Sequence, residues 1–301
     1  MKLNHFLCLL AVLFLASCKK EKMEETVTET TADTIAKVRP DDNHKIPELE
    51  KLTGDFIKRK KETEEKLKAL SPLEANALYE DLLKQNGQAL MAIEKLEEDF
   101  VINYYNYFYE GEKQITPPDS IQKKVKLLTR AKLEVWDIGE GMVEIRTVPD
   151  YYKDIFEKYV TEDYSEFIAI NAEEDKALFS NDAAIAIPLE DVGKRVISWE
   201  KFIAKYPDSK RIGDAKNLYL DYVMSYLFGQ DNTPVMDYES GKIYPENLAD
   251  FKKFIARYPD SPTTKLINMV ISNKGSHDEL RETILEEIKK MGFDTSIYGG
   301  T

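Results

Sequence analysis

Hydrophobic residues recur at spacings of three and four along most of the chain. Leu49, Leu52 and Phe56 fall on one side of a helix at this spacing, while the Lys/Glu-rich run 58–68 is largely polar. Because residues three and four apart share a helical face, this pattern predicts amphipathic helices. The sequence therefore predicts a mainly α fold, a helical bundle, for residues 46–301.

Local signals predict where several helices begin and end. Ser71-Pro72-Leu73-Glu74 is typical of a helix start, because serine caps the first turn, proline suits its first position and glutamate can return to the cap amide. We expect this helix to end at Asn86-Gly87, where glycine can adopt the left-handed conformation of a helix terminus. The hydrophobic residues of the next predicted helix are Leu90, Ile93, Phe100, Tyr104 and Phe108. Further helices are expected after the Thr116-Pro117-Pro118-Asp119 break, around 151–159 and around 165–177.

One segment departs from the helical pattern. Residues 133–148 read LEVWDIGEGMVEIRTV, and its second half alternates as a strand does. Gly139-Glu140-Gly141 supplies a turn between the two halves. We therefore predict a small β-hairpin at about 133–148 that packs on the helices, with Trp136 inserted between them.

An aromatic run at residues 104–109 allows two interpretations. Tyr104 and Phe108 are four residues apart and share a helical face, so we expect them in the core. The alternative is a ligand role for the run, such as stacking against a sugar ring.

An internal repeat lies in the C-terminal part of the chain. Residues 199–209, WEKFIAKYPDS, and residues 251–261, FKKFIARYPDS, are identical at eight of eleven positions, at an offset of 52. Proline removes an amide donor and ends a helix, and the Asp-Ser that follows can cap the next one. Each copy therefore predicts a helix, a tight turn and a second helix. The hydrophobic stripe of the two copies is the predicted repeat core: Trp199, Phe202, Ile203, Tyr206, Phe251, Phe254, Ile255 and Tyr258.

These motifs resemble tetratricopeptide-like repeats, in the F-x-x-Y-P-D-S variety found in bacterial envelope proteins. The resemblance covers about residues 187–274 and implies a C-terminal pair of helical hairpins, but it specifies little about function. The repeat of that family is about 34 residues long, whereas here the offset is 52, and the excess lies in the insert 229–246. Two copies are fewer than such an array usually needs, so we expect the pair to pack against the rest of the chain and a helix from Ser276 to Gly292 to cap it.

The first eighteen residues resemble the export signal of a lipoprotein. The apolar run 6–15 would span about 15 Å as a helix, roughly half a bilayer core, which suits a signal peptide better than a membrane span. Leu15-Ala16-Ser17-Cys18 resembles the lipobox of bacterial lipoproteins. That resemblance implies cleavage after residue 17 and a diacylglycerol thioether on Cys18. The alternative is an ordinary signal peptide that leaves a free thiol at Cys18.

The residues around Cys18 support an anchored mature protein. Cys8 leaves with the signal peptide, so Cys18 is the only cysteine of the mature chain and can form no internal disulfide. Residues 19–45 hold six basic residues, seven acidic residues and five threonines, a composition that predicts a flexible tether. Lys19 rather than aspartate follows the cysteine, which by the rule for Gram-negative lipoproteins permits transfer to the outer membrane.

The predicted organisation has four parts. A signal peptide (1–17) precedes the lipidated cysteine and tether (18–45), a helical region with the hairpin (46–186) and the tetratricopeptide-like region (187–301). We expect the mature protein in the cell envelope, held by its lipid anchor.

Charge and motifs limit the possible chemistry. The net charge of −13 argues against nucleic acid as a partner. The mature chain has two histidines, His44 and His277, and no familiar catalytic motif, so the sequence predicts no catalytic residue, metal site or cofactor. Asp231, Asn232, Asp237, Tyr238 and Glu239 could ligate calcium, but they do not match the twelve-residue calcium loop, and an ordered structural loop is the favoured interpretation.

Two hypotheses about function follow. The favoured one is a membrane-anchored scaffold without catalytic activity that binds an envelope protein or peptide. The alternative is a lipoprotein that binds a carbohydrate or small ligand, or acts on glycans through a pair of carboxylates. The alternative predicts a pocket lined by tyrosine or tryptophan with an acidic residue opposite.

Overall fold

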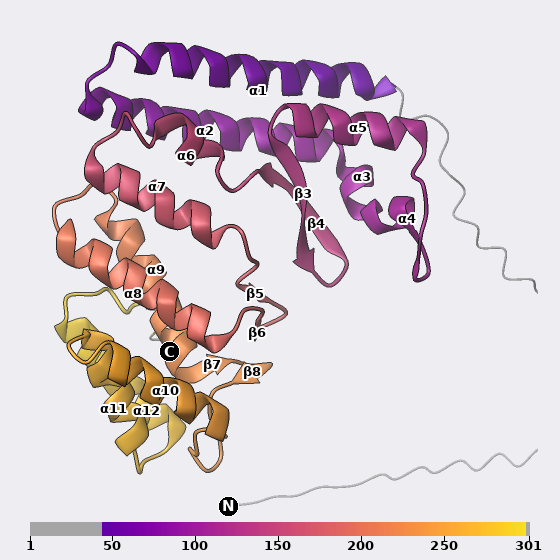
Figure 1. Ribbon diagram of the computed structural model, residues 1–301. Coiled ribbons are helices and arrows are strands. Elements are labelled where there is room, and N and C mark those ends of the chain that lie inside the picture. The colour runs from indigo at the N-terminus through magenta and orange to yellow at the C-terminus, as the bar shows by residue number, and fades with distance from the viewer. Residues whose placement is uncertain (1–43, 299–301) are drawn as a thin grey trace, which may run out of the picture. The chain divides into compact units, whose positions relative to one another are not determined.

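The structure, a computed structural model, describes residues 44–298. This part of the chain is mainly helical, with twelve helices and four two-stranded antiparallel hairpins (Figure 1). None of its helices is long and apolar enough to cross a membrane. The helices are α1 (Ile46–Leu67), α2 (Pro72–Leu96), α3 (Glu98–Ile102), α4 (Tyr104–Phe108), α5 (Asp119–Arg130), α6 (Tyr151–Phe156), α7 (Glu162–Glu174), α8 (Leu189–Lys205), α9 (Ile212–Phe228), α10 (Pro245–Arg257), α11 (Pro262–Ser272) and α12 (His277–Lys290). The strands pair as β1 (Tyr109–Glu110) with β2 (Lys113–Gln114), β3 (Leu133–Gly139) with β4 (Met142–Thr147), β5 (Ser180–Asn181) with β6 (Ala184–Ile185), and β7 (Gly229–Gln230) with β8 (Thr233–Pro234).

The predicted export signal, the predicted lipidation site Cys18 and the predicted tether up to residue 43 lie outside the described residues. Helix α1 begins at Ile46, where the sequence predicts the folded part to start.

Two helix starts form as the sequence predicts. Ser71 and Glu74 make a reciprocal capping box at the start of α2, and Ser276 and Glu279 make another at the start of α12. Each box satisfies backbone amides that have no partner within the helix. Gly292 follows α12 with φ of 88°, a left-handed conformation that suits glycine.

Helix α2 does not end at Asn86-Gly87, as the sequence predicts, but continues to Leu96. Asn86 is fully buried, and its side chain joins separate helices. It accepts a hydrogen bond from Arg59 Nε (3.0 Å) and donates one to the Tyr152 hydroxyl (3.3 Å). A side chain used in this way does not compete with the helical backbone, so the local signal for a helix end is overridden. A Cβ at Gly87 would meet no other atom, which fits an exposed position inside a helix.

The predicted helix after Gly87 is divided among the end of α2, α3 and α4. Phe100 is fully buried, and its ring contacts those of Tyr104 and Tyr107, with centroids 5.6 Å and 6.3 Å away. Tyr104 and Phe108 are partly buried against the same core, in line with the core interpretation of the aromatic run.

The hairpin predicted at 133–148 is present as β3 and β4, but Trp136 is not packed between it and the helices. Leu133 and Ile145 are buried on the face that meets α2, α3 and α5. Because successive residues of a strand point to opposite faces, Trp136 lies on the other face of β3. There the guanidinium of Arg146 covers its ring at 3.6 Å. The predicted position of Trp136 is therefore wrong.

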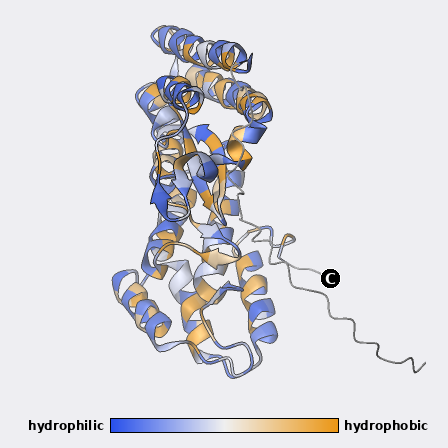
Figure 2. Ribbon diagram, turned by 90° about the vertical axis from the view of Figure 1, so that its right-hand side faces the viewer, coloured by the Kyte–Doolittle hydropathy of each residue, from blue (hydrophilic) through white to orange (hydrophobic). Residues whose placement is uncertain are grey.

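The buried hydrophobic residues of the described chain form two clusters. The first draws on α1 to α7 and the second on α7 to α12. Helix α7 contributes to both, with Tyr164 and Ile168 in the first cluster and Phe167 in the second. Many helical turns carry both hydrophobic and hydrophilic residues, which Figure 2 shows in orange and blue, as in helices with one buried side.

The two copies of the repeated sequence adopt the same local structure. Each forms a helix, a turn and a second helix, as α8–α9 and α10–α11. Tyr206 and Tyr258 end their helices with φ/ψ of −128°/59° and −130°/59°. Their amides donate to the carbonyls of Phe202 (2.9 Å) and Phe254 (2.8 Å).

The turn after each tyrosine differs in one respect. Ser261 Oγ accepts from the amide of Thr263 (3.1 Å) and caps α11 directly, as predicted. Ser209 Oγ accepts from the amide of Arg211 (3.1 Å), but α9 begins only at Ile212 and has no side-chain cap. The cap predicted for the first copy is therefore wrong, because additional residues separate the serine from the helix.

Both turn serines also bind a carboxylate of a preceding helix. Ser209 Oγ donates to Asp163 of α7 (2.5 Å), and Ser261 Oγ donates to Glu200 of α8 (2.7 Å). The turn end of each helix pair is thus attached to the helix before it.

The insert 229–246 is an ordered part of the core. Val235 and Met236 are each 1% exposed, and Met236 forms a bridge with Ile243. Hairpin β7–β8 also lies against β5–β6, where the amide of Asn232 donates to the carbonyl of Ala183 (2.9 Å). The structure agrees with the interpretation of the insert as a structural loop.

Candidate functional site: the groove between helices α7 and α8

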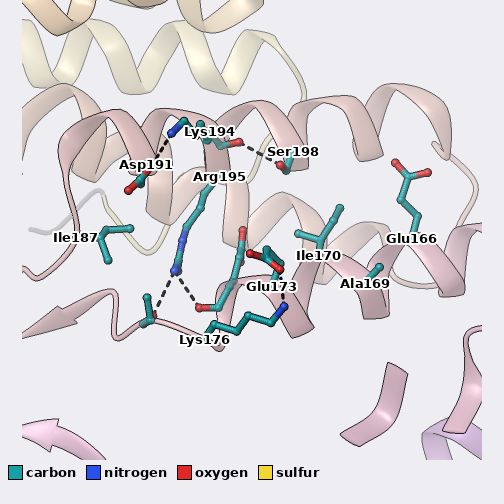
Figure 3. A pocket seen from close by; sticks show the side chains of 12 residues that line it. Glu166, Ala169, Ile170, Glu173, Lys176, Ile187, Asp191, Lys194, Arg195 and Ser198 are labelled. Atoms are coloured by element: carbon teal, nitrogen blue, oxygen red, sulfur yellow. Dashed lines mark hydrogen bonds and ion pairs between the residues drawn. The ribbon is translucent and has the colours of Figure 1, made fainter. Parts of the chain in front are cut away.

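A groove runs along the surface between α7 and α8 (Figure 3). It consists of two adjoining hollows of about 520 Å³ and 430 Å³ that share Glu166 and Ala169. Ala169, Ile170, Ala177 and Ile187 provide its apolar surface, and charged side chains stand around them. We call this feature the α7–α8 groove.

A hydrogen-bonded glutamate stands at one end of the groove. Glu174, the last residue of α7, accepts from the indole N–H of Trp199 and from the hydroxyl of Tyr222, each at 2.9 Å. Burial raises the pKa of the Glu174 carboxyl to about 7, although both hydrogen bonds and nearby Arg195 act in the opposite direction. Desolvation therefore dominates and favours the protonated form of this carboxyl.

Arg195 closes the same end. Its guanidinium donates to the carbonyls of Glu174 (2.9 Å) and Ala177 (3.2 Å), contacts that Figure 3 shows, and to the Tyr222 hydroxyl (3.0 Å). The last carbonyls of a helix have no partner within it, so Arg195 both completes the end of α7 and holds Tyr222 toward Glu174. This arginine joins α7 and α9 to α8.

A second glutamate stands toward the other end. Glu166 Oε2 accepts from Lys205 Nζ (2.7 Å) and from the Tyr206 hydroxyl (2.9 Å). The hydrogen bond to Glu166 raises the pKa of Lys205, which stays charged. Tyr206 thus packs its ring on the core and presents its hydroxyl to the groove.

The groove has an acidic balance. The two hollows hold six carboxylates and four cations. The carboxylates are Glu157, Glu162, Glu166, Glu173, Glu174 and Asp191, and the cations are Lys176, Lys194, Arg195 and Lys205. Lys176, Lys194 and Lys205 pair with three of these carboxylates, and Arg195 donates to backbone carbonyls, so carboxylates remain in excess over cations. A ligand with positive charge therefore fits this groove better than an anion.

The predicted repeat-core residues divide into an inner and an outer set. The inner set is buried and consists of Trp199, Phe202, Phe251 and Phe254. The outer set is partly buried, packs against the same cluster and consists of Ile203, Tyr206, Ile255 and Tyr258. Sequence reasoning placed Trp199 in the core but gave no sign of its bond to Glu174, which lies 25 residues away in the chain.

Tyr258 also borders a hollow, as Tyr206 does. A cavity of about 140 Å³ lies between α8 and α10, with Tyr258 and Gly193 in its wall. A Cβ at Gly193 would lie 3.1 Å from the ring of Tyr226 and 3.2 Å from that of Phe254. Glycine at this position therefore lets α8 and α10 approach closely.

The other candidate residues of the sequence do not gather at the groove. His277 packs between the rings of Phe228 and Tyr238, with centroids 5.5 Å and 4.8 Å away. Asp237 accepts from the amide and hydroxyl of Ser240 (2.7 Å and 2.5 Å), a common turn arrangement. Within residues 44–298, no three His, Cys, Asp or Glu side chains are grouped so that they could hold a metal ion.

Comparisons of the chain with protein-family models, with curated proteins and with solved structures find no match. Function is therefore inferred from the side chains that line the groove. It offers an apolar strip between charged walls, which suits binding along its length.

Proposed function

We propose that this protein is a lipid-anchored envelope protein that binds a segment of a partner protein in the α7–α8 groove. The acidic, partly apolar groove beside the repeated helix pairs is the observation that carries the proposal. The repeated Y-P-D-S turns and their matching geometry favour tetratricopeptide-like helical hairpins, whose grooves serve as docking surfaces. The lipobox-like Leu15–Cys18 segment supports anchoring through Cys18.

The proposed occupant is an extended peptide, and the length of the groove sets its size. Helix α7 has 13 residues and is about 20 Å long, at 1.5 Å per residue. An extended peptide advances about 3.3 Å per residue, so about six residues would cover that length. The excess of carboxylates favours a segment that carries lysine or arginine.

The proposal assigns no catalysis to the groove. Glu174 has a raised pKa, but both of its oxygens accept hydrogen bonds from buried or partly buried side chains of the protein. These two hydrogen bonds connect the end of α7 to α8 and α9 through the Glu174 carboxylate. We therefore propose a binding protein that is not an enzyme and needs no cofactor.

Site-specific photo-cross-linking tests the binding surface. A photo-reactive amino acid is placed at Ala169, inside the groove, or at Ala256, on the exposed side of α10, in the full-length protein in its producing cells. We expect a discrete adduct from position 169 and none from position 256, with the cross-linked partner peptide mapped by mass spectrometry. Equal labelling at both positions, or no adduct at 169, would contradict the proposal.

Charge reversal tests the chemistry of the occupant. Glu173→Lys adds a cation at the groove, whereas Glu282→Lys adds the same charge at an exposed position of α12. We expect the first substitution to reduce the adduct from position 169 severalfold and the second to leave it unchanged. An adduct that gains intensity with Glu173→Lys would show that the occupant is acidic.

The anchor requires its own test. Cys18→Ser removes the thiol that would accept the lipid, so we expect the protein to shift from the membrane fraction to the soluble fraction and to lose its acyl mass at the mature N-terminus. Outer-membrane fractions should contain the wild-type protein if Lys19 permits its transfer. An unmodified N-terminus in the wild-type protein would refute the lipoprotein assignment.

A further inference from the structure

A second, separate hollow lies at the tip of the β3–β4 hairpin. It has a volume of about 610 Å³ and is bounded by the hairpin tip, by Tyr105 of α4 and by Asn181 of β5. Figure 1 shows the β3–β4 hairpin between α4 and the β5–β6 hairpin. The hollow shares no residue with the α7–α8 groove.

Trp136 is held in a fixed orientation in this hollow. The guanidinium of Arg146 covers one face of its indole at 3.6 Å. Arg146 is itself held by Glu134 (2.9 Å) and by the backbone carbonyl of Asp175 (2.8 Å). The indole is only partly buried and forms part of the lining, so an aromatic surface is available without rearrangement.

Asp137 is also pre-oriented. One carboxylate oxygen accepts from the Tyr105 hydroxyl (2.6 Å) and the other from the amide of Gly139 (2.7 Å). These two bonds lower the pKa of Asp137, which stays ionised. A carboxylate oxygen can accept more than one hydrogen bond, so each retains capacity for a ligand hydroxyl. Asp137 is exposed to solvent at the hollow.

Asn181 lies against the hairpin tip because Gly139 has no side chain. A Cβ at Gly139 would fall 2.2 Å from Asn181 Nδ2, and the φ of this glycine is 92°. Within residues 44–298, neither the side-chain amide of Asn181 nor the indole N–H of Trp136 takes part in a hydrogen bond. The hollow therefore combines an aromatic surface, a fixed acceptor and two available donors.

We propose that this hollow binds an uncharged oligosaccharide. The C–H faces of a sugar ring pack against an aromatic ring, whose faces carry partial negative charge. Asp137 and Asn181 both line the hollow and offer a carboxylate acceptor and an amide donor to hydroxyls of the oligosaccharide. Asp137 and Glu140 at the rim disfavour acidic sugars. The inference does not depend on the groove, so either site can fail its test while the other stands.

Tryptophan fluorescence provides a local readout. The protein has two tryptophans, Trp199 fully buried and Trp136 partly exposed, so a ligand in the hollow should change the emission of Trp136 alone. Purified full-chain protein is titrated with cellotetraose, maltotetraose and chitotetraose at millimolar concentrations. We expect saturable quenching or a blue shift with at least one of them. If none of the three changes the emission or gives heat by calorimetry, the proposal is overturned.

Variants locate the binding. Trp136→Ala and Asp137→Asn should each weaken affinity by about tenfold or more, measured by calorimetry so that loss of the fluorophore does not matter. Tyr238→Ala removes an exposed aromatic ring far along the chain and should leave affinity unchanged. Thermal melting confirms that each variant is folded. Binding that survives both hollow variants, or is lost equally with Tyr238→Ala, would refute the site.

Discussion

Substituting Glu174 by glutamine should make the protein more stable at alkaline pH. The Glu174 carboxyl has a pKa raised from 4.5 to about 7 because burial disfavours its charged form. The folded protein therefore retains a proton that the unfolded chain releases, and its free energy of unfolding falls as the pH rises from about 4.5 to about 7. Glutamine keeps the shape and the acceptor oxygen for Trp199 Nε1 but never becomes charged.

The size of the effect follows from the pKa. A change from 4.5 to about 7 corresponds to about 3 kcal/mol between the two protonation states. Glu174 is only partly buried, so solvent screens part of this free-energy difference. We therefore expect the charged carboxylate to cost about 2 kcal/mol of stability. Below pH 4.5 both proteins carry a neutral group at position 174, and their free energies of unfolding should agree. Above pH 7 the variant should be more stable by about 2 kcal/mol.

Urea denaturation followed by circular dichroism, at several pH values from 4 to 8, measures this difference. Glu173→Gln is the matched control, because the Lys176 hydrogen bond lowers the pKa of that neighbouring exposed carboxyl. The ionised Glu173 carboxylate stabilises the folded protein at pH values above the pKa that this group has in the unfolded chain. The Glu173→Gln variant should therefore be slightly less stable than wild type at pH 8. If Glu174→Gln is less stable than wild type at pH 8, the carboxylate acts as a charged partner of Arg195 and the burial argument is refuted.

Two further predictions concern stability and use the same denaturation assay. Gly87→Ala should stabilise the protein by about 0.5–1 kcal/mol, because α2 continues through this open position. Gly292→Ala should destabilise it by a similar amount, because the φ of Gly292 is 88°. A loss of stability with Gly87→Ala would indicate that the helix ends there. Tyr206→Ala and Tyr258→Ala should each lower the free energy of unfolding by about 1–2 kcal/mol, because both rings are only partly buried. Phe202 is fully buried, so Phe202→Ala should cost roughly 3–5 kcal/mol. Equal losses for all three variants would show that the two tyrosine rings are as deeply buried as Phe202.

Short-range features of the fold could be predicted from the sequence. The Y-P-D-S turns, the capping boxes at Ser71 and Ser276 and the hairpin at 133–148 depend on residues within a few positions of one another. Helical spacing likewise indicated which side of each repeated helix is buried, since that side follows from the period alone. The lipid anchor at Cys18 stays a prediction.

Features that depend on distant residues could not be predicted. Asn86 and Gly87 form a local signal for a helix end, but tertiary hydrogen bonds from Asn86 outweigh it. The sequence predicts Trp136 between the hairpin and the helices, but strand alternation places it on the face opposite Leu133. The α7–α8 groove and the hairpin hollow each join segments that are remote in the chain, and no local pattern indicates which carboxylates meet there.

The stack of repeated helix pairs is attached at both of its ends. At the turns, Ser209 and Ser261 each bind a carboxylate of an earlier helix. At the opposite end, hairpins β5–β6 and β7–β8 join the connections that lead into α8 and α10. With bonds at both ends, neighbouring pairs have no single hinge about which to open. Under a pulling force we therefore expect the two helix pairs to separate together rather than one after the other.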